Sequence, residues 1–158
     1  MIPTLNLWPT SDMEHALTQP QTSWTQSWGQ VPLRIVLGIV FMMHGWQKLF
    51  DFGVAGTADI LGKLGIPLAT AAAVLLIVVE LAGGMAILIG SFARTAALLL
   101  AIEMCVAIPV ARFGGGFFTP YGYEFEMTLL GACLTLAAIG PGGVSADTWW
   151  RRRSAAPG

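Results

Sequence analysis

The feature that most constrains this 158-residue chain is a series of four apolar stretches, each close to 20 residues long. They cover about residues 32–50, 68–90, 93–112 and 123–140. An α-helix needs about 20 apolar residues to cross the ~30 Å hydrocarbon core of a bilayer, whereas the strands of a membrane barrel are about half as long and alternate in polarity. Because these stretches do not alternate, we predict an all-α membrane protein built as a bundle of four transmembrane helices.

The composition agrees with burial in lipid. Charged residues make up 11% of the chain and hydrophobic residues 55%, whereas a soluble domain has about 25% charged residues. The net charge is −1 and there is no basic stripe, so nucleic acid is not an expected partner. Cys105 and Cys133 lie inside apolar stretches without metal-ligand spacing. We therefore interpret them as small buried side chains and expect no metal site.

Three parts follow from this pattern. We predict a polar N-terminal tail at 1–31 that lies partly at the membrane interface, a four-helix domain at 32–143, and a short basic tail at 144–158. The first part carries no Lys or Arg and no apolar run of the kind that a signal peptide needs, so we expect it to be a mature tail.

Connections between the stretches carry their own signals. The longest one includes residues 57–64, which we expect to form a short helix at the interface. Gly90 precedes a two-residue connection and is expected to cap the preceding helix in a tight hairpin. Pro109 falls inside the third stretch and should kink its last turn, because proline has no N–H to donate.

The distribution of Lys and Arg predicts the orientation in the membrane. With four spans, both termini and the second connection share one side. That side carries more basic residues than the other, Arg34, Arg94, Arg151, Arg152 and Arg153 against Lys48, Lys63 and Arg112. Cytoplasmic loops are enriched in Lys and Arg, so we predict that both termini are cytoplasmic.

Three ionisable residues fall near the middle of the predicted spans. At a rise of about 1.5 Å per residue, His44, Glu80 and Glu103 lie ~15–18 Å from the inner ends of three different helices. Ionisable groups at this depth are costly and often mark a functional site. We therefore predict a polar midplane layer, although His44 could equally make a structural hydrogen bond between helices.

On the first predicted helix the polar residues share a face. Arg34, His44 and Lys48 form one stripe at about 100° per residue, and Gln47 lies beside it. Arg34 at the inner helix end has a second interpretation as an orientation anchor.

A second polar layer is expected at the outer end, made by Lys48, Asp51, Arg112, Glu124 and Glu126. Lys48, Arg112 and Glu126 could alternatively extend their charged groups to the lipid headgroups. Glu124 and Glu126 are about 200° apart on a helix, so they cannot both face the bundle equally.

Several ordered motifs resemble those of the DoxX family of small bacterial membrane proteins. They are Arg34 to Gly38, His44-Gly45-Trp46-Gln47-Lys48-Leu49-Phe50, Gly65-Ile66-Pro67, Glu80-Leu81-Ala82-Gly83-Gly84, Gly116-Phe117-Phe118 through Gly122-Tyr123-Glu124-Phe125, and Gly140-Pro141-Gly142. The resemblance extends over about residues 32–143.

This resemblance implies four transmembrane helices in the bacterial inner membrane. It implies a role near membrane redox chemistry, because founding members are small subunits of a thiosulfate:quinone oxidoreductase and others are linked to complexes that handle oxidative stress and thiol redox. It also favours Glu124 over Glu126 as the inward carboxylate, with Tyr123 beside it.

Two hypotheses of different classes follow. In the first, the chain is a subunit of a quinone-linked oxidoreductase. His44 and Lys48 would donate hydrogen bonds to a quinone carbonyl, and Glu80 and Glu103 would pass protons. The sequence has no CxxC motif, no Gly-rich dinucleotide loop and no pair of haem ligands, so electrons would come from a partner subunit. Whether the chain is itself an enzyme stays open.

In the second, the chain is a non-catalytic assembly or anchor subunit, or a small-solute carrier. The buried polar residues would then hold helices together or bind a proton-coupled solute. Dependence on a partner separates the two, because a carrier would act alone or as a homo-oligomer.

Overall fold

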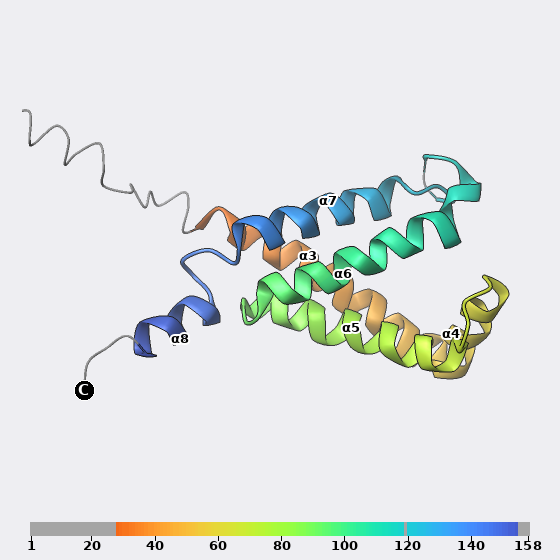
Figure 1. Ribbon diagram of the computed structural model, residues 1–158, viewed down its shortest axis with the longest axis horizontal. Helices are drawn as coiled ribbons and strands as arrows, with labels where there is room; N and C mark the ends of the chain where they lie inside the picture. The colour runs from red at the N-terminus through yellow and green to blue at the C-terminus, as the bar shows by residue number, and fades with distance from the viewer. Residues whose placement is uncertain (1–27, 119, 155–158) are drawn as a thin grey trace, which may run out of the picture.

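Four long helices lie side by side along the long axis of the molecule (Figure 1). The computed structural model describes residues 28–118 and 120–154. The long helices are α3 (Gln30–Trp46), α5 (Ala69–Ile89), α6 (Ala93–Ala107) and α7 (Glu124–Ile139). Each coincides with one of the four apolar stretches, and all regular elements within the described residues are helical. The all-α prediction is therefore confirmed.

Shorter elements extend or connect these helices. A π-helical turn, η1 (Gln47–Asp51), continues α3, and α4 (Gly53–Lys63) crosses the end of the bundle beyond it (Figure 1). The π-helical η2 (Ile108–Arg112) and the 3₁₀ turn η3 (Phe113–Gly115) continue α6, and α8 (Ala146–Ser154) follows α7 at the opposite end.

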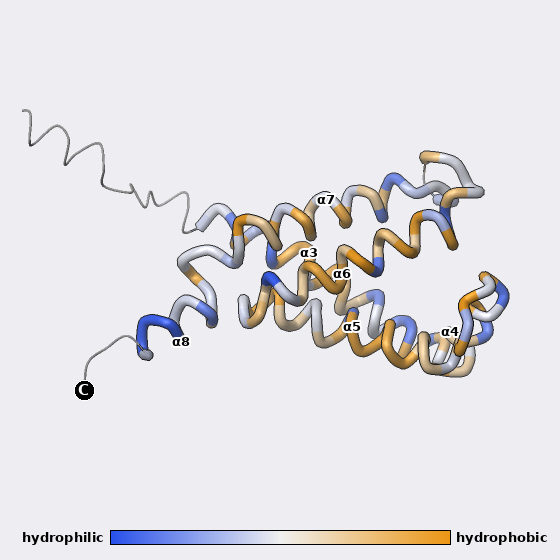
Figure 2. Tube along the Cα trace, in the orientation of Figure 1, coloured by the Kyte–Doolittle hydropathy of each residue, from blue (hydrophilic) through white to orange (hydrophobic). Residues whose placement is uncertain are grey.

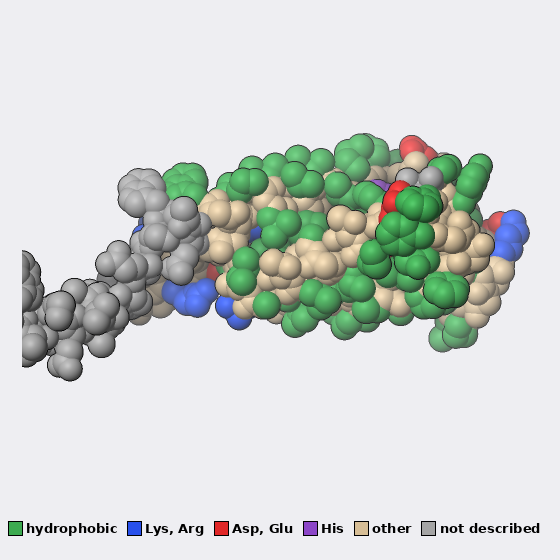
Figure 3. Space-filling model, turned by 90° about the horizontal axis from the view of Figure 1, so that it is seen from above, with side chains coloured by type: hydrophobic (Ala, Val, Ile, Leu, Met, Phe, Trp, Pro, Cys, Tyr) green, Lys and Arg blue, Asp and Glu red, His purple; other side chains and the backbone are tan. Residues whose placement is uncertain are grey.

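Within the described part of the chain, two helices are long and apolar enough to span a membrane, α5 and the continuous helical segment Ala93–Gly115. Apolar residues follow the length of the bundle, whereas α8 is strongly hydrophilic (Figure 2). Hydrophobic side chains cover the long face seen in Figure 3, and Lys and Arg gather toward the two ends. This distribution is the one expected for a protein surrounded by lipid. The count of four spans stays a prediction.

The signals in the connections predicted local structure correctly. Gly90 adopts a left-handed conformation with φ 77°, and its N–H donates to the Ala86 and Ile87 carbonyls. Pro109 lies in the π-helical turn η2, where its missing N–H interrupts the regular α-helical ladder. The short helix expected at 57–64 is α4, which begins earlier than predicted.

Glycines allow α3 and α5 to pack with their backbones in close contact. A Cβ atom added to Gly38 would lie 2.8 Å from the Gly84 carbonyl oxygen, and one added to Gly84 would lie 2.9 Å from the Gly38 carbonyl oxygen. Small residues at such crossings are the main device by which helices associate in lipid, where apolar side chains gain little from leaving the solvent. Gly38 and Gly84 therefore make the close contact between α3 and α5 possible.

Arg34 ties three segments together at the end of the bundle that carries α8. Its side chain is buried, and its Nε and Nη2 atoms each donate at 2.9 Å, to the Ile87 and Leu88 carbonyls respectively. Its Nη1 atom donates to Pro141 and Val144 at 3.0 and 2.6 Å. The last carbonyls of a helix have no partner within that helix, so Arg34 satisfies the end of α5. This structural role accounts for its burial without any part in a midplane site.

The predicted basic tail is attached to the bundle. The Asp147 carboxylate of α8 accepts from the backbone N–H groups of Phe92 and Ala93, at 2.9 and 3.4 Å, and so caps the N-terminus of α6. In return, the Asp147 N–H donates to the Gly90 carbonyl at 3.0 Å. The segment after residue 143 is thus part of the fold rather than a loose extension, as far as residue 154.

Substitution of Gly84 by Ala should destabilise the protein, because the new methyl group must displace the α3 backbone. We expect a loss of about 1–3 kcal/mol, which is typical of overpacking. Gly131→Ala is the matched control, since it lies on an exposed helix surface with no neighbouring atom within 4 Å, and it should gain up to about 1 kcal/mol of helix propensity. Unfolding in mixed detergent micelles measures both, and equal effects of the two changes would contradict this packing.

Substitution of Arg34 by Met removes all its donors while keeping most of the side-chain length. At least about 3 kcal/mol of stability should be lost, because several buried carbonyls become unsatisfied at once. Arg94→Met removes a single exposed bond of 3.3 Å to the Ile139 carbonyl and should cost under about 1 kcal/mol. A thermal unfolding series in detergent compares the two, and similar losses would argue against the proposed role of Arg34.

Candidate functional site

A largely buried ion pair joins η1, the continuation of α3, to α5 in the interior of the bundle. The Lys48 Nζ atom donates to Glu80 Oε1 at 2.7 Å, and the Glu80 side chain is only 3% exposed. The two helices are antiparallel, and side chains on a helix lean toward its N-terminus. The Lys48 side chain therefore points from the end of the bundle toward its interior. The Glu80 side chain points the opposite way, toward Lys48, so the two charged groups meet.

Glu103 of α6 completes a group that we call the central cluster, Lys48, Glu80 and Glu103. Its carboxyl group lies within hydrogen-bonding reach of Glu80 and interacts electrostatically with Lys48. The cluster thus joins η1, the extension of α3, to α5 and α6.

The central cluster has one negative charge more than it has positive charge if both carboxyl groups are ionised. An uncompensated charge is costly in a low-dielectric interior, and two neighbouring carboxyl groups can relieve it by sharing a proton. One oxygen of each carboxyl group, Oε2 of Glu80 and Oε2 of Glu103, is buried without a hydrogen-bond partner among the described residues. The cluster therefore has the groups to bind a proton and the spare acceptors to hydrogen-bond a small polar ligand.

His44 lies apart from this cluster, against α7. Its Nδ1 atom is 2.9 Å from the Val40 carbonyl oxygen one turn earlier, and its ring stacks on Phe125 with the centroids 5.8 Å apart. Two of the three residues predicted for one midplane layer, Glu80 and Glu103, therefore belong to the central cluster. The third residue of the cluster is Lys48 and not the predicted His44.

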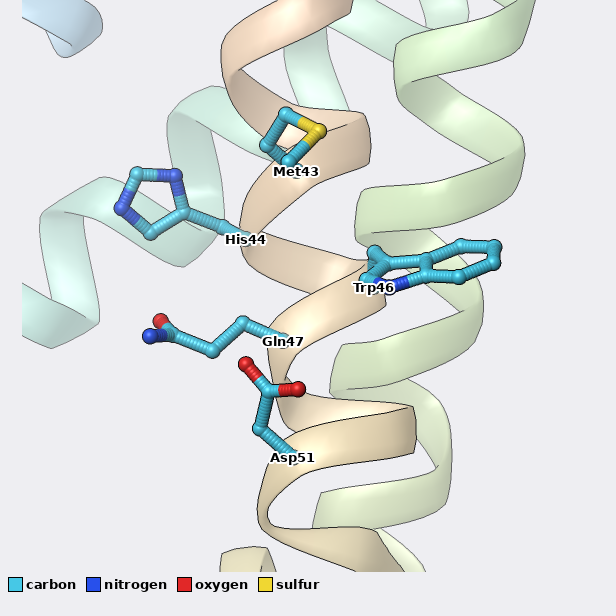
Figure 4. A pocket seen from close by; sticks show the side chains of 5 residues that line it. All are labelled: Met43, His44, Trp46, Gln47 and Asp51. Carbon is cyan, nitrogen blue, oxygen red and sulfur yellow. The ribbon is translucent and has the colours of Figure 1, made fainter.

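A shallow cavity of about 220 Å³ lies on the flank of α3 and η1 beside His44. His44, Gln47 and Asp51 point to one side of the helix there, whereas Trp46 points to the other (Figure 4). The residues that line the cavity are Met43, His44, Trp46, Gln47 and Asp51. The predicted polar neighbour Gln47 thus lies with His44 rather than with the central cluster.

A second ion pair lies at the end of the bundle that is opposite α8. Arg112 Nε donates to Glu126 Oε1 at 2.7 Å, and Glu126 is buried with 8% exposure. Glu124 is only half-buried. The expectation that Glu124 is the inward carboxylate of the two is therefore wrong, because Arg112 at the end of η2 reaches Glu126 across the connection.

Aromatic rings pack against one another in the connection between α6 and α7. Tyr123 stacks on Phe113 with the centroids 5.8 Å apart and meets Phe117 edge to face at 5.5 Å. The connection between α6 and α7 is thus held by its own rings, which explains why Tyr123 packs there rather than beside the central cluster.

Sequence reasoning placed Lys48 at the outer end because it measured depth from Cα positions. The lean of side chains toward the helix N-terminus, applied to two antiparallel helices, would have brought Lys48 and Glu80 together. No comparable signal was available for Arg112 and Glu126, since their pairing depends on the path of an irregular connection.

The fold and the cluster define a class of protein, a small helical membrane protein with a buried ionisable centre. A model of the DoxX family matches residues 29–113. The chain belongs to this family. All three residues of the central cluster lie within the matched segment.

Three relatives illustrate the similarity. An Escherichia coli protein named "Inner membrane protein YqjF" is 33% identical over 121 residues, covering 75% of this chain and 89% of that protein. A Bacillus subtilis protein named "Putative oxidoreductase CatD" is 30% identical over 112 residues, covering 71% and 79%. A Mycobacterium tuberculosis protein named "Uncharacterized membrane protein Rv3486" is 31% identical over 137 residues, covering 80% and 83%. No solved structure matches the chain significantly.

Replacing Lys48 by Met should leave two buried carboxyl groups without their cation. We expect a loss of about 3 kcal/mol, the lower end for breaking a buried pair, because Lys48 keeps 22% exposure. The double variant Lys48→Met with Glu80→Gln should recover part of this loss, since one carboxylate is then neutral. Lys63→Met is the control; it breaks an exposed pair with Asp59 and should cost under about 1 kcal/mol. A double-mutant cycle in detergent measures the coupling, and strictly additive effects would rule out the pair as a stabilising contact.

Proposed function

We propose that this chain is an integral membrane subunit of a quinone-linked oxidoreductase or redox-stress complex, and that the central cluster is its polar intramembrane site. The observation that carries the proposal is the convergence of Lys48, Glu80 and Glu103 from three helices, with buried carboxylate oxygens left to accept a hydrogen bond. Ionisable groups buried between membrane helices are most often placed there for ligand binding or proton transfer.

The residue types suit a quinone headgroup. A bound quinone supplies two carbonyl oxygens and takes up two electrons and two protons on reduction. Lys48 can donate a hydrogen bond to a carbonyl, and Glu80 and Glu103 can hold the protons that arrive there. His44 and Gln47 offer further donors on the flank of α3. Electrons come from a partner subunit in this proposal, because the sequence carries no redox-centre motif of its own.

The proposed subunit crosses the bacterial inner membrane four times, with both termini in the cytoplasm. The end of the bundle with Arg34, Arg94 and the three arginines of α8 then faces inward, and the end with Lys63 and Arg112 faces outward. The excess of basic residues at the α8 end supports this orientation. The names of two relatives fit the proposed location and chemistry, since one is named "Inner membrane protein YqjF" and the other "Putative oxidoreductase CatD".

The test is purification of the tagged full chain from native membranes in mild detergent, with mass spectrometry of the co-purifying proteins and extraction of bound quinone. We expect a redox protein in stoichiometric amount and quinone approaching one per complex. Glu80→Gln and Lys48→Met should each lower the quinone content about tenfold, which corresponds to the loss of one charge-assisted hydrogen bond.

Lys63→Gln is the control, because its ion pair with Asp59 is exposed on α4 and lies outside the cluster. Its quinone content should match that of the unaltered chain. Recovery of a lone chain or homo-oligomer without quinone would reject the proposal, and would favour the assembly-subunit or solute-carrier alternative.

A further inference from the structure

A second cavity lies at the opposite end of the bundle from the α6–α7 connection. It has a volume of about 640 Å³, within the ~300–1,000 Å³ range of ligand pockets. Its walls come from the start of α3, the end of α5 and the segment that leads into α8, and include Ile35, Leu88, Ile89, Val144, Trp149 and Arg152. We call it the α8 groove. It is independent of the central cluster and of the proposed redox function.

The wall that α8 provides is firmly fixed. Thr148 Oγ1 donates to the Gly142 carbonyl at 3.0 Å, and Ser145 Oγ accepts from the Thr148 N–H at 3.2 Å. Asp147 joins the start of α8 to the α5–α6 turn, as described above. The groove is therefore a fixed feature of the fold, because these hydrogen bonds hold α8 in place.

The groove is apolar inside and basic at its α8 edge. Arg34 contributes to its floor, but four of its five side-chain N–H groups already donate to carbonyl oxygens, so it has little capacity left to bind an anion. The free positive charge lies on α8, where Arg151, Arg152 and Arg153 are exposed. These arginines follow one another at the hydrophilic end of the molecule (Figure 2).

Two tryptophans adjoin the arginines. Trp149 and Trp150 are 51% and 70% exposed, and the Arg153 guanidinium lies 4.0 Å from the centre of the Trp149 ring. Tryptophan is enriched at the level of lipid headgroups, and arginine clusters next to membrane helices attract anionic lipids. An apolar slot bordered by Trp and Arg matches a molecule with an acyl chain and a negatively charged headgroup.

We propose that the α8 groove binds an anionic phospholipid of the adjacent leaflet. One acyl chain occupies the apolar part of the groove, bounded by the start of α3, the end of α5 and the segment that leads into α8, and the phosphate lies against the arginines of α8. Charge complementarity selects this occupant, because a neutral lipid would leave the three guanidinium groups without anionic partners.

The experiment uses delipidated full-length protein in detergent, titrated with phosphatidylglycerol or phosphatidylcholine and followed by native mass spectrometry. Phosphatidylglycerol should bind at least tenfold more tightly. Arg152→Gln should weaken its binding about fivefold, the fold change that ~1 kcal/mol per basic residue gives, and the triple Arg→Gln variant at 151–153 about a hundredfold. Lys63→Gln at the far end of the bundle should have no effect. Equal binding of the two lipids, or unchanged binding by the triple variant, would overturn the proposal.

A matched pair of substitutions tests the slot without altering charge. Ile35→Trp fills the groove, whereas Val36→Trp places the same ring on the neighbouring exposed position, which does not line it. The first should weaken phosphatidylglycerol binding at least tenfold and the second should not. Equal effects of the two would show that the headgroup binds a charged surface only, against the proposal.

Inorganic phosphate at millimolar concentration separates a lipid site from a general anion site. It should fail to displace phosphatidylglycerol, because it lacks the acyl chain that occupies the slot. Displacement would overturn the lipid assignment.

Discussion

The close crossing of α3 and α5 is the contact on which the rest of this structure depends. Gly38 and Gly84 bring the two backbones together, and a Cβ atom at Gly45 would lie 3.1 Å from the Glu80 Cβ. This approach places Glu80 beside the end of α3, where Lys48 can reach it, and the same approach holds Arg34 against the last turn of α5. A wider crossing would leave both charged groups buried without partners, which a low-dielectric interior tolerates poorly.

Buried charges in this bundle have two kinds of partner, with different consequences. Arg34 binds only backbone carbonyls, so its positive charge is shared by dipoles that cannot change their protonation. The central cluster joins an ammonium group to two carboxyl groups, which can gain or lose a proton. The first arrangement fixes geometry, and the second leaves a choice of protonation states, which is why the cluster rather than Arg34 is the candidate for chemistry.

Much of the architecture could be predicted from the sequence, because apolar length, glycine caps and proline act locally. The four long helices, the Gly90 turn and the disturbance at Pro109 all follow from such signals. Glu80 and Glu103 could be expected at one depth from residue counts. Residue counts alone do not identify Lys48 as their partner, since a lysine side chain spans more than a helical turn and its Cα position is a poor guide to its charge. The pairing follows only when the lean of side chains toward the helix N-terminus is also taken into account.

The end of the bundle that carries α8 has a consequence for biosynthesis. Arg34, on the first long helix, finds two of its acceptors at Pro141 and Val144, more than a hundred residues later, and α6 receives its cap from Asp147. While the chain is still emerging from the ribosome, the early helices therefore carry a buried guanidinium group that is only partly satisfied and a helix start without its cap. Residues 141–147 close this end of the structure only after all four long helices have been made, so a chain that stopped before them would be altered at α3 and α6 as well.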